Sequence, residues 1–177
     1  ALRKAGPLPQ IKWVPSPHHS SRGGRAPIAL VLHTMGGFLA GCDAWFQNPQ
    51  SQVSAHYGIG LGGECHQYVQ LGEAAWANGI LEPGNTWPGP VGVNPNALSV
   101  SIETEDNRSN LTPVSDAQYA ATLAISRLIL AQHPTITMLV SHRVISPSSR
   151  AHCCGERWID SGRFATLAAA LGLKALA

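Results

Sequence analysis

Residues 28–34, Ile28-Ala29-Leu30-Val31-Leu32-His33-Thr34, decide the fold of this 177-residue chain. The first five residues are apolar without interruption, which is typical of a central strand that is buried on both faces. The apolar run stops at His33 and Thr34, ahead of Gly36-Gly37. The stretch therefore predicts a core strand that carries a polar side chain at its carboxyl end.

Outward from this strand, strand patterns and helix patterns alternate along the chain. The other expected strands are residues 54–60, 64–70, 98–104 and 137–140, with Gly62-Gly63 as a hairpin turn between the first two. The expected helices are residues 38–46, the segment from the capping residue Ser115 to Pro134, and residues 161–173. Interleaved strands and helices predict an α/β fold with a mixed central β-sheet flanked by helices.

Two segments rich in proline and glycine interrupt this pattern. Residues 1–26 are expected to form an extended arm without regular structure, anchored by Trp13, and residues 78–97 a long loop. Within that loop, Trp87 either lines a groove or fills the space beneath the loop. Because the chain is long enough for one hydrophobic core, we expect a single domain over residues 27–177.

The composition excludes several classes of protein. The 12 Lys and Arg residues are scattered and the net charge is only +2, so we expect no nucleic-acid partner. The longest apolar stretch, residues 27–32, is too short to span a bilayer, which predicts a soluble chain. Four cysteines are too few for a disulfide framework, although a bridge between Cys42 and Cys65 stays open.

Candidate metal ligands recur where strands end. His33 follows the first strand, His142 follows the strand at 137–140, and Ala151-His152-Cys153-Cys154-Gly155 comes about ten residues later. Three nitrogen or sulfur donors, with the fourth position left to water, make up a catalytic zinc site, whereas a structural zinc needs four protein ligands. Such donors also favour zinc over calcium or magnesium. Taken singly, each donor has a more ordinary interpretation, as a hydrogen-bonded histidine or a buried, small apolar cysteine.

Five groups of residues recur in the same order in one family. They are Leu30-Val31-Leu32-His33-Thr34; Ser54-Ala55-His56-Tyr57 with Gly63-Glu64-Cys65-His66-Gln67-Tyr68-Val69; Ala75-Trp76; Asn96-Ala97-Leu98-Ser99-Val100-Ser101-Ile102-Glu103; and Ser141-His142-Arg143 through Ser146-Pro147 to Cys153-Cys154-Gly155. Over about residues 27–170, the chain resembles the zinc-dependent N-acetylmuramoyl-L-alanine amidases of the type-2 amidase and peptidoglycan-recognition-protein family, which includes phage endolysins similar to the T7 lysozyme.

The resemblance implies a zinc amidase catalytic domain at 27–177, preceded by the arm at 1–26, with one Zn²⁺ per chain in a surface groove. It implies hydrolysis of the amide bond between N-acetylmuramic acid and L-alanine in peptidoglycan. A bacteriolytic, antimicrobial enzyme of this kind is expected to be a monomer that degrades the bacterial cell wall, as a phage endolysin does.

The resemblance also implies roles for individual residues. His33 and His142 match two zinc ligands, and Cys153 matches the third, with His152 and Cys154 as open alternatives. Glu103 matches the general base, because amide hydrolysis needs a carboxylate that moves protons beside a metal that acidifies water and stabilises developing negative charge. The alternative for Glu103 is an exposed carboxylate paired with an arginine, either Arg108 or Arg143.

The chain departs from the family pattern at two positions. Ala151 stands where many relatives have Lys or Thr, and Arg150 is the candidate substitute for that residue. Ala77 follows Trp76 where several relatives have a histidine. The remaining histidine with a family match, His56, is expected to be structural or to support a ligand.

Two other function classes stay open at this point. The first is a peptidoglycan-binding protein that keeps the groove and has lost catalysis. The second is a metal-independent hydrolase with a cysteine nucleophile and a histidine base. Cys42 is the candidate nucleophile, because it is the one cysteine near the start of an expected helix.

Overall fold

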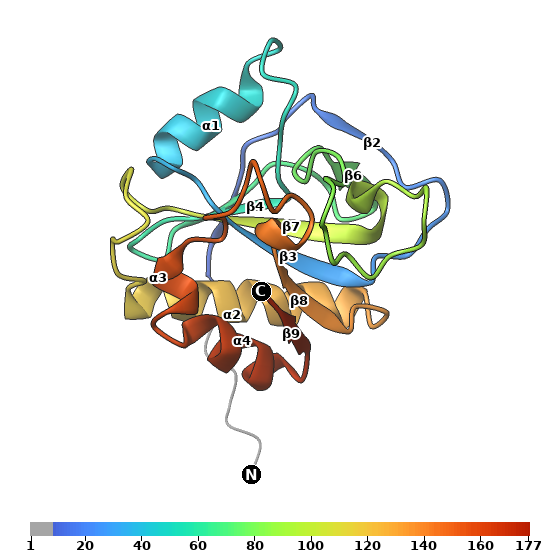
Figure 1. Ribbon diagram of the computed structural model, residues 1–177. Helices are drawn as coiled ribbons and strands as arrows, with labels where there is room; N and C mark the ends of the chain where they lie inside the picture. The colour runs from blue at the N-terminus through green and yellow to red at the C-terminus, as the bar shows by residue number, and fades with distance from the viewer. Residues whose placement is uncertain (1–8) are drawn as a thin grey trace.

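A seven-stranded mixed sheet forms the centre of the molecule (Figure 1), for which a computed structural model describes residues 9–177. In spatial order the strands are β1 (Ile11–Trp13), β5 (Cys65–Gln67), β4 (Tyr57–Ile59), β7 (Ser99–Thr104), β3 (Ala29–Thr34), β8 (Met138–Ser141) and β9 (Lys174–Leu176). Only the β4–β5 hairpin is antiparallel; the other pairs in this sheet are parallel. The expected α/β fold with a mixed central sheet is therefore confirmed.

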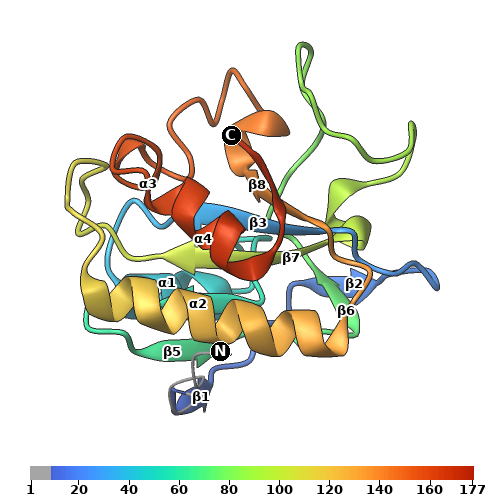
Figure 2. The same cartoon turned by 90° about the horizontal axis from the view of Figure 1, so that it is seen from below.

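Helices cover both faces of the sheet. The long helix α2 (Asp116–Gln132) and the shorter α4 (Arg163–Leu171) lie side by side across one face, and α3 (Glu156–Ile159) precedes α4; Figure 2 shows this face. Helix α1 (Leu39–Gln47) lies on the opposite side of the sheet (Figure 1). Among residues 9–177, no helix is both long enough and apolar enough to cross a membrane.

Alternation along β3 decides which side chains meet the large helices. Leu30 and Leu32 pack in the core cluster that includes residues of α2 and α4. Ala29 and Val31 belong to a second cluster on the other face, together with Trp87. Because side chains alternate between the two faces of a strand, His33 is directed to the same face as Val31. The fold thus places this histidine on the side of the sheet away from α2.

Helix α2 begins as its sequence predicts. The Ser115 hydroxyl accepts a hydrogen bond from the Gln118 amide at 2.9 Å and so caps the first turn. In a capping box, Gln118 would return this bond to the main chain of Ser115. Here its side chain instead donates to the carbonyl oxygens of Ile59 and Glu105, at 3.1 and 2.9 Å. The same glutamine therefore ties α2 to the ends of β4 and β7.

The expectation of an irregular N-terminal arm is wrong for the part that the structure describes. Residues 11–13 form β1, the edge strand of the main sheet, and β2 (His19–Ser21) pairs with β6 (Glu73–Ala75) in a separate two-stranded sheet. Trp13 is 48% exposed and is no anchor. The arm is held by Arg22, which is 5% exposed. Residues 1–8 lie outside the described residues, and a division of the chain at residue 26 stays a prediction.

The side chain of Arg22 acts as a buried hydrogen-bond donor to four main-chain carbonyl groups. Its guanidinium lies 3.1 Å from Leu71 O, 3.4 Å from Asn96 O, 3.1 Å from Ala97 O and 2.9 Å from Ser99 O. Burial lowers the pKa of Arg22 to about 10, so the group stays charged at neutral pH. Arg22 thus joins the N-terminal segment to the loop that leads into β7.

Replacing Arg22 by methionine is expected to lower the free energy of unfolding by about 3 kcal/mol or more, because buried carbonyl groups lose their donors. Urea unfolding followed by circular dichroism measures this change. Arg127→Met is the matched control, since Arg127 is exposed on α2; its effect is expected to stay within about 0.5 kcal/mol. Equal effects of the two substitutions would show that Arg22 does not hold the arm.

Candidate metal centre and active site

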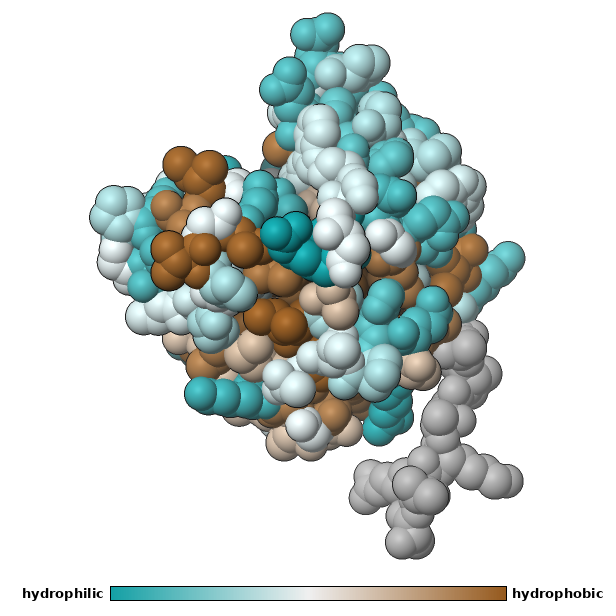
Figure 3. Space-filling view, turned by 90° about the vertical axis from the view of Figure 1, so that its right-hand side faces the viewer, coloured by the Kyte–Doolittle hydropathy of each residue, from teal (hydrophilic) through white to brown (hydrophobic). Residues whose placement is uncertain are grey.

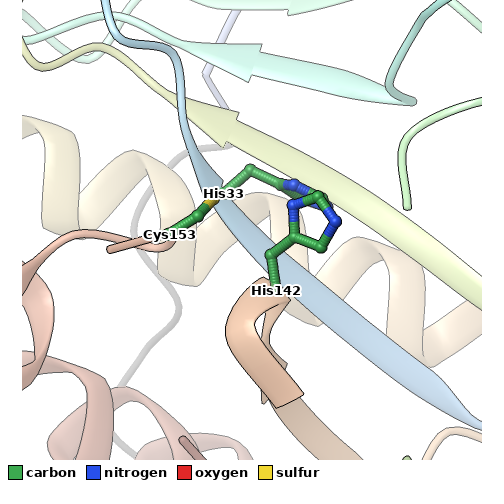
Figure 4. Close-up of side chains that lie close together, drawn as sticks. All are labelled: His33, His142 and Cys153. Atoms are coloured by element: carbon green, nitrogen blue, oxygen red, sulfur yellow. The ribbon is translucent and has the colours of Figure 1, made fainter. Parts of the chain in front are cut away.

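Two histidines and one cysteine meet at the carboxyl end of the sheet (Figure 4). His33 is near the end of β3, His142 directly follows β8, and Cys153 lies in the loop before α3. Their potential ligand atoms all lie within 4.8 Å of one another. Because β3 and β8 are parallel, with Leu32 opposite Ser141, both strands deliver the next residue to the same place. The two imidazole rings lie 4.4 Å apart, centroid to centroid.

Hydrogen bonds from the strand ends hold the loop that carries Cys153. The Ser141 hydroxyl donates to the carbonyl oxygen of Cys153 at 2.7 Å and accepts from the Cys154 amide at 3.1 Å. The Arg143 amide donates to the same carbonyl oxygen at 2.9 Å. The Thr34 amide lies 3.4 Å from the Cys153 sulfur, within the distance of a hydrogen bond to sulfur. The loop is therefore positioned by β3 and β8 themselves.

The geometry separates the three candidates for the third donor. Cys153 is the candidate that joins the two histidines. The side chain of His152 is 75% exposed and interacts with Glu156. Cys154 is 1% exposed and packs in the core cluster beneath the loop, with Trp158. Adjacent residues in this loop thus point to three different environments: solvent, the donor cluster and the core.

Burial keeps the three donors uncharged in the absence of a cation. It lowers the pKa of His33 well below its usual value, and His142 lowers it further. Burial also lowers the pKa of His142 to about 4 and raises the pKa of the Cys153 thiol well above its usual value. Neutral imidazole is the form that binds a metal, and a thiol loses its proton when it does so. His33 Nε2 is buried without a hydrogen-bond partner.

Glu103 lies beside this cluster. It is directly opposite His33 in the β3–β7 register, and its Oε1 atom is 3.9 Å from His33 Nδ1. Burial raises the pKa of Glu103 to about 8, with a smaller contribution from Asp106. The other carboxylate oxygen, Oε2, is buried without a hydrogen-bond partner. Within residues 9–177 this carboxylate forms no ion pair with Arg108 or Arg143, so the alternative of an exposed ion-paired glutamate is wrong.

A cavity of about 680 Å³ opens over the donor cluster. His33, His142, Cys153 and Glu103 all line it, and α1 with the preceding loop forms another wall. That wall includes Phe38, Cys42, Trp45 and Phe46, with Arg108 nearby. A second cavity of about 490 Å³ shares His142 and Arg150 with the first. Figure 3 shows one face of the molecule, on which the surface is hollowed between two raised parts.

Cys42 lacks the properties of an activated nucleophile. Burial raises the pKa of its thiol well above the usual value, and the charge of Glu103 raises it further. A nucleophilic cysteine needs the opposite shift, because the thiolate is the reactive form. Cys42 and Cys65 are both free, so the open possibility of a bridge between them is not realised in the structure. These observations disfavour a metal-independent thiol mechanism.

Three other residues that the sequence analysis named lie outside the donor cluster. His56 is fully buried; its Nδ1 atom accepts from the Ser101 amide at 3.0 Å, and its Nε2 atom lies 3.0 Å from Glu73 O. Trp87 is 7% exposed and packs in the cluster with Val31, so it fills the space under its loop and does not line either of the two cavities. Arg150 is exposed at the junction of the two cavities.

Three polar residues near the cluster carry no signal in the sequence. Asn78 is fully buried and its carbonyl oxygen lies 3.0 Å from His142 Nε2. The Asp106 carboxylate accepts from the Thr34 hydroxyl at 2.7 Å. The Glu105 carboxylate accepts from the amides of Leu39 and Leu61. No local motif marks these positions, because each contact joins segments that are distant in sequence.

Comparison with known proteins identifies the family. Residues 23–156 match the family model described as N-acetylmuramoyl-L-alanine amidase. The chain belongs to this family. The amidase AmpD of Haemophilus influenzae, a 1,6-anhydro-N-acetylmuramyl-L-alanine amidase, is 28% identical over 183 residues, which cover 90% of this chain and 89% of the relative.

Solved structures agree with this assignment. A crystal structure of a selenomethionine AmpD derivative superposes with a TM-score of 0.75 at 29% identity and covers 94% of this chain and 99% of that one. The N-acetylmuramoyl-L-alanine amidase LysC from Clostridium intestinale has a TM-score of 0.66 at 20% identity, with 94% and 100% covered, and shares the fold. The amidase described here hydrolyses the bond between N-acetylmuramic acid and L-alanine in peptidoglycan, which confirms the activity predicted from the sequence.

Proposed function

We propose that this amidase depends on one zinc ion held by His33, His142 and Cys153. The observation that carries the proposal is the meeting of two neutral imidazoles and one thiol within 4.8 Å. Two nitrogens and one sulfur make up the ligand set of a catalytic zinc site, in which the fourth position stays open. The buried, unpartnered Nε2 atom of His33 also fits this interpretation, since a buried polar ring normally finds partners.

Glu103 is the proposed general base. When bound, zinc supplies a Lewis acid that acidifies water and polarises the amide carbonyl. The Glu103 carboxylate would accept the proton of the attacking water and return it to the leaving amine of L-alanine. Its position opposite His33, on the wall of the cavity, supports this role. A buried carboxyl group with a raised pKa is suited to such proton transfer, because it holds and releases a proton near neutral pH.

The form in which the enzyme meets its substrate is also a proposal. We propose that the enzyme acts on the bacterial cell wall as a lytic monomer, in the manner of a phage endolysin. The similarity to AmpD favours a second candidate substrate, a soluble muropeptide with a 1,6-anhydro sugar. The two substrates share the bond that is cut and differ in the sugar and in polymer length. Both substrates yield peptides that start with L-alanine. Mass spectrometry of separate reactions on purified peptidoglycan and on soluble anhydromuropeptides therefore distinguishes them by which substrate releases these peptides faster.

Removal of metal is expected to abolish amide hydrolysis, and zinc alone is expected to restore it. The measurement combines metal content by atomic spectroscopy with the release of peptides from peptidoglycan, before and after dialysis against a chelator. Cys42→Ser is the companion variant. If zinc is the catalyst, this variant keeps its zinc dependence and most of its rate. Activity that survives chelation but disappears in Cys42→Ser would favour the thiol mechanism instead.

A further inference from the structure

The second cavity, of about 490 Å³, adjoins the donor cluster and has no part in the proposed mechanism. His142 and Arg150 line both this cavity and the one over the cluster. We propose that the second cavity holds the stem peptide of peptidoglycan and that Arg150 binds the first free carboxylate of this peptide. This inference rests on the proposed function, since it takes the donor cluster as the place where the amide bond is cut.

The substrate extends in two directions from that bond, with N-acetylmuramic acid on the acyl side and the peptide on the amine side. Because His142 lines both cavities, a bond beside the cluster has one cavity on each side. The wall that α1 gives to the first cavity carries Phe38 and Trp45, which are 42% and 53% exposed. Flat aromatic rings suit the apolar face of a sugar. The second cavity is thus left for the peptide.

The lining of the second cavity is rich in groups that form hydrogen bonds with a peptide. It includes the side-chain amides of Asn94 and Asn96 and the hydroxyl groups of Ser146 and Ser149. The Oδ1 atoms of both asparagines accept from main-chain amides, each at 2.9 Å, so their NH₂ groups are the ends left to donate. A peptide offers a carbonyl acceptor at every residue, and donors of this kind match it.

Arg150 is the only lysine or arginine among the described residues that line this cavity. Its side chain is exposed, and within residues 9–177 its guanidinium forms no ion pair. The guanidinium donates to Ser149 O at 3.2 Å. A guanidinium has five N–H donors in a planar arrangement that matches a carboxylate. Arg150 is therefore available to bind an anionic group of the substrate.

The stem peptide carries such a group close to the bond that is cut. Its second residue is a D-glutamate that is linked to the third residue through its γ-carboxyl group, so its α-carboxylate is free. This carboxylate is one residue away from the amine of L-alanine that hydrolysis releases. A charge-assisted hydrogen bond from Arg150 would favour the carboxylate over a neutral amide of the same shape.

Hydrogen bonds fix the main chain of Arg150 relative to the donor cluster. Its amide donates to Ser146 O at 2.9 Å, and its carbonyl oxygen accepts from the Cys153 amide, also at 2.9 Å. The segment that carries Arg150 is thus bonded directly to a proposed zinc ligand. A carboxylate bound by Arg150 would lie at a defined place relative to the amide bond.

Glu82 is the one carboxylate among the described residues that line the second cavity, and main-chain amides bind it. Its Oε2 atom accepts from the amides of Ser148 and Ser149, at 2.8 and 3.1 Å. The Glu82 amide donates to Ile145 O at 3.1 Å. These bonds join the long loop to the segment before Arg150 and so connect two walls of the cavity. Glu82 therefore shapes the cavity and leaves Arg150 unpaired.

Two soluble substrates that differ in one group test the proposal. They are N-acetylmuramoyl-L-alanyl-γ-D-glutamyl-L-lysine and the same compound with an amide in place of the α-carboxylate of glutamate. We expect kcat/KM of the wild-type amidase to be about 10-fold higher for the carboxylate. The difference should lie mainly in KM, because the group is remote from the reacting atoms. In Arg150→Gln, the two substrates should have equal kcat/KM.

Arg108→Gln is the matched control. Arg108 lines the cavity over the cluster, where its guanidinium lies 5.1 Å from the centre of the Phe38 ring, on the side assigned to the sugar. This variant should keep the preference of the wild type for the carboxylate. Arg150→Gln changes no main-chain group, so its zinc content should equal that of the wild type.

Several outcomes would overturn the proposal. A wild-type enzyme without preference overturns it before any substitution is made. So does an Arg150→Gln protein that keeps the preference, or an Arg108→Gln protein that loses it. An equal fall in kcat on both substrates in Arg150→Gln would instead assign Arg150 to the charge that develops during the reaction. If the wild type cleaves both substrates without bound metal, the proposed zinc dependence fails, whereas the ratio of the two kcat/KM values still tests Arg150.

Discussion

Cys153→Ala is expected to lose zinc binding and, with it, amidase activity. Structural zinc sites bind with about 10–16 kcal/mol through four ligands, so one ligand contributes on the order of 3–4 kcal/mol, or roughly 10²–10³-fold in the dissociation constant. The sulfur of Cys153 has no substitute, because the neighbouring donors point elsewhere. Zinc affinity by chelator competition and peptide release from peptidoglycan measure the two losses.

The two neighbours of Cys153 provide controls that also test the choice of ligand. His152→Ala removes an exposed side chain and should leave zinc affinity unchanged. Cys154→Ala removes a buried sulfur from the core. It should lower the free energy of unfolding by about 1–2 kcal/mol while zinc still binds. A Cys153→Ala protein that retains tight zinc, together with loss of zinc in either neighbour, would assign the third ligand to that neighbour.

Glu103→Gln is expected to keep its zinc and to lose at least ~100-fold in kcat, the usual contribution of a positioned general base. Glutamine preserves the volume of the side chain but cannot accept and return a proton. Product release from peptidoglycan gives the rate, and metal analysis of the same sample shows whether the site is loaded.

An exposed carboxylate serves as the control for this substitution. Glu64 is exposed in the turn between β4 and β5, and Glu64→Gln should leave kcat within about twofold, as expected for a surface substitution away from the site. Wild-type activity in a zinc-loaded Glu103→Gln protein would remove Glu103 from the mechanism. Loss of zinc in that variant would instead indicate that the carboxylate supports the histidine opposite to it.

Long periodic segments were predictable because their pattern reports burial. The apolar run before His33 and the stripe that follows Ser115 became β3 and α2 close to the expected bounds. In contrast, β1, β2, β6 and β9 are each three residues long. Three residues are too few to show an alternation. These strands form because their main-chain groups pair with those of a neighbouring strand. Which segment lies beside such a strand depends on the tertiary structure.

The sequence by itself determined the class of fold, the family, and the two histidines that follow core strands, because strands in a parallel sheet deliver their ends to one edge. Tertiary structure alone decided which of His152, Cys153 and Cys154 faces those histidines, since the hydrogen bonds from Ser141 turn this loop. It also brought the buried carbonyl of Asn78 to His142, 64 residues away. Pattern in a sequence reports which residues are buried, whereas contacts between distant segments depend on how the whole core packs.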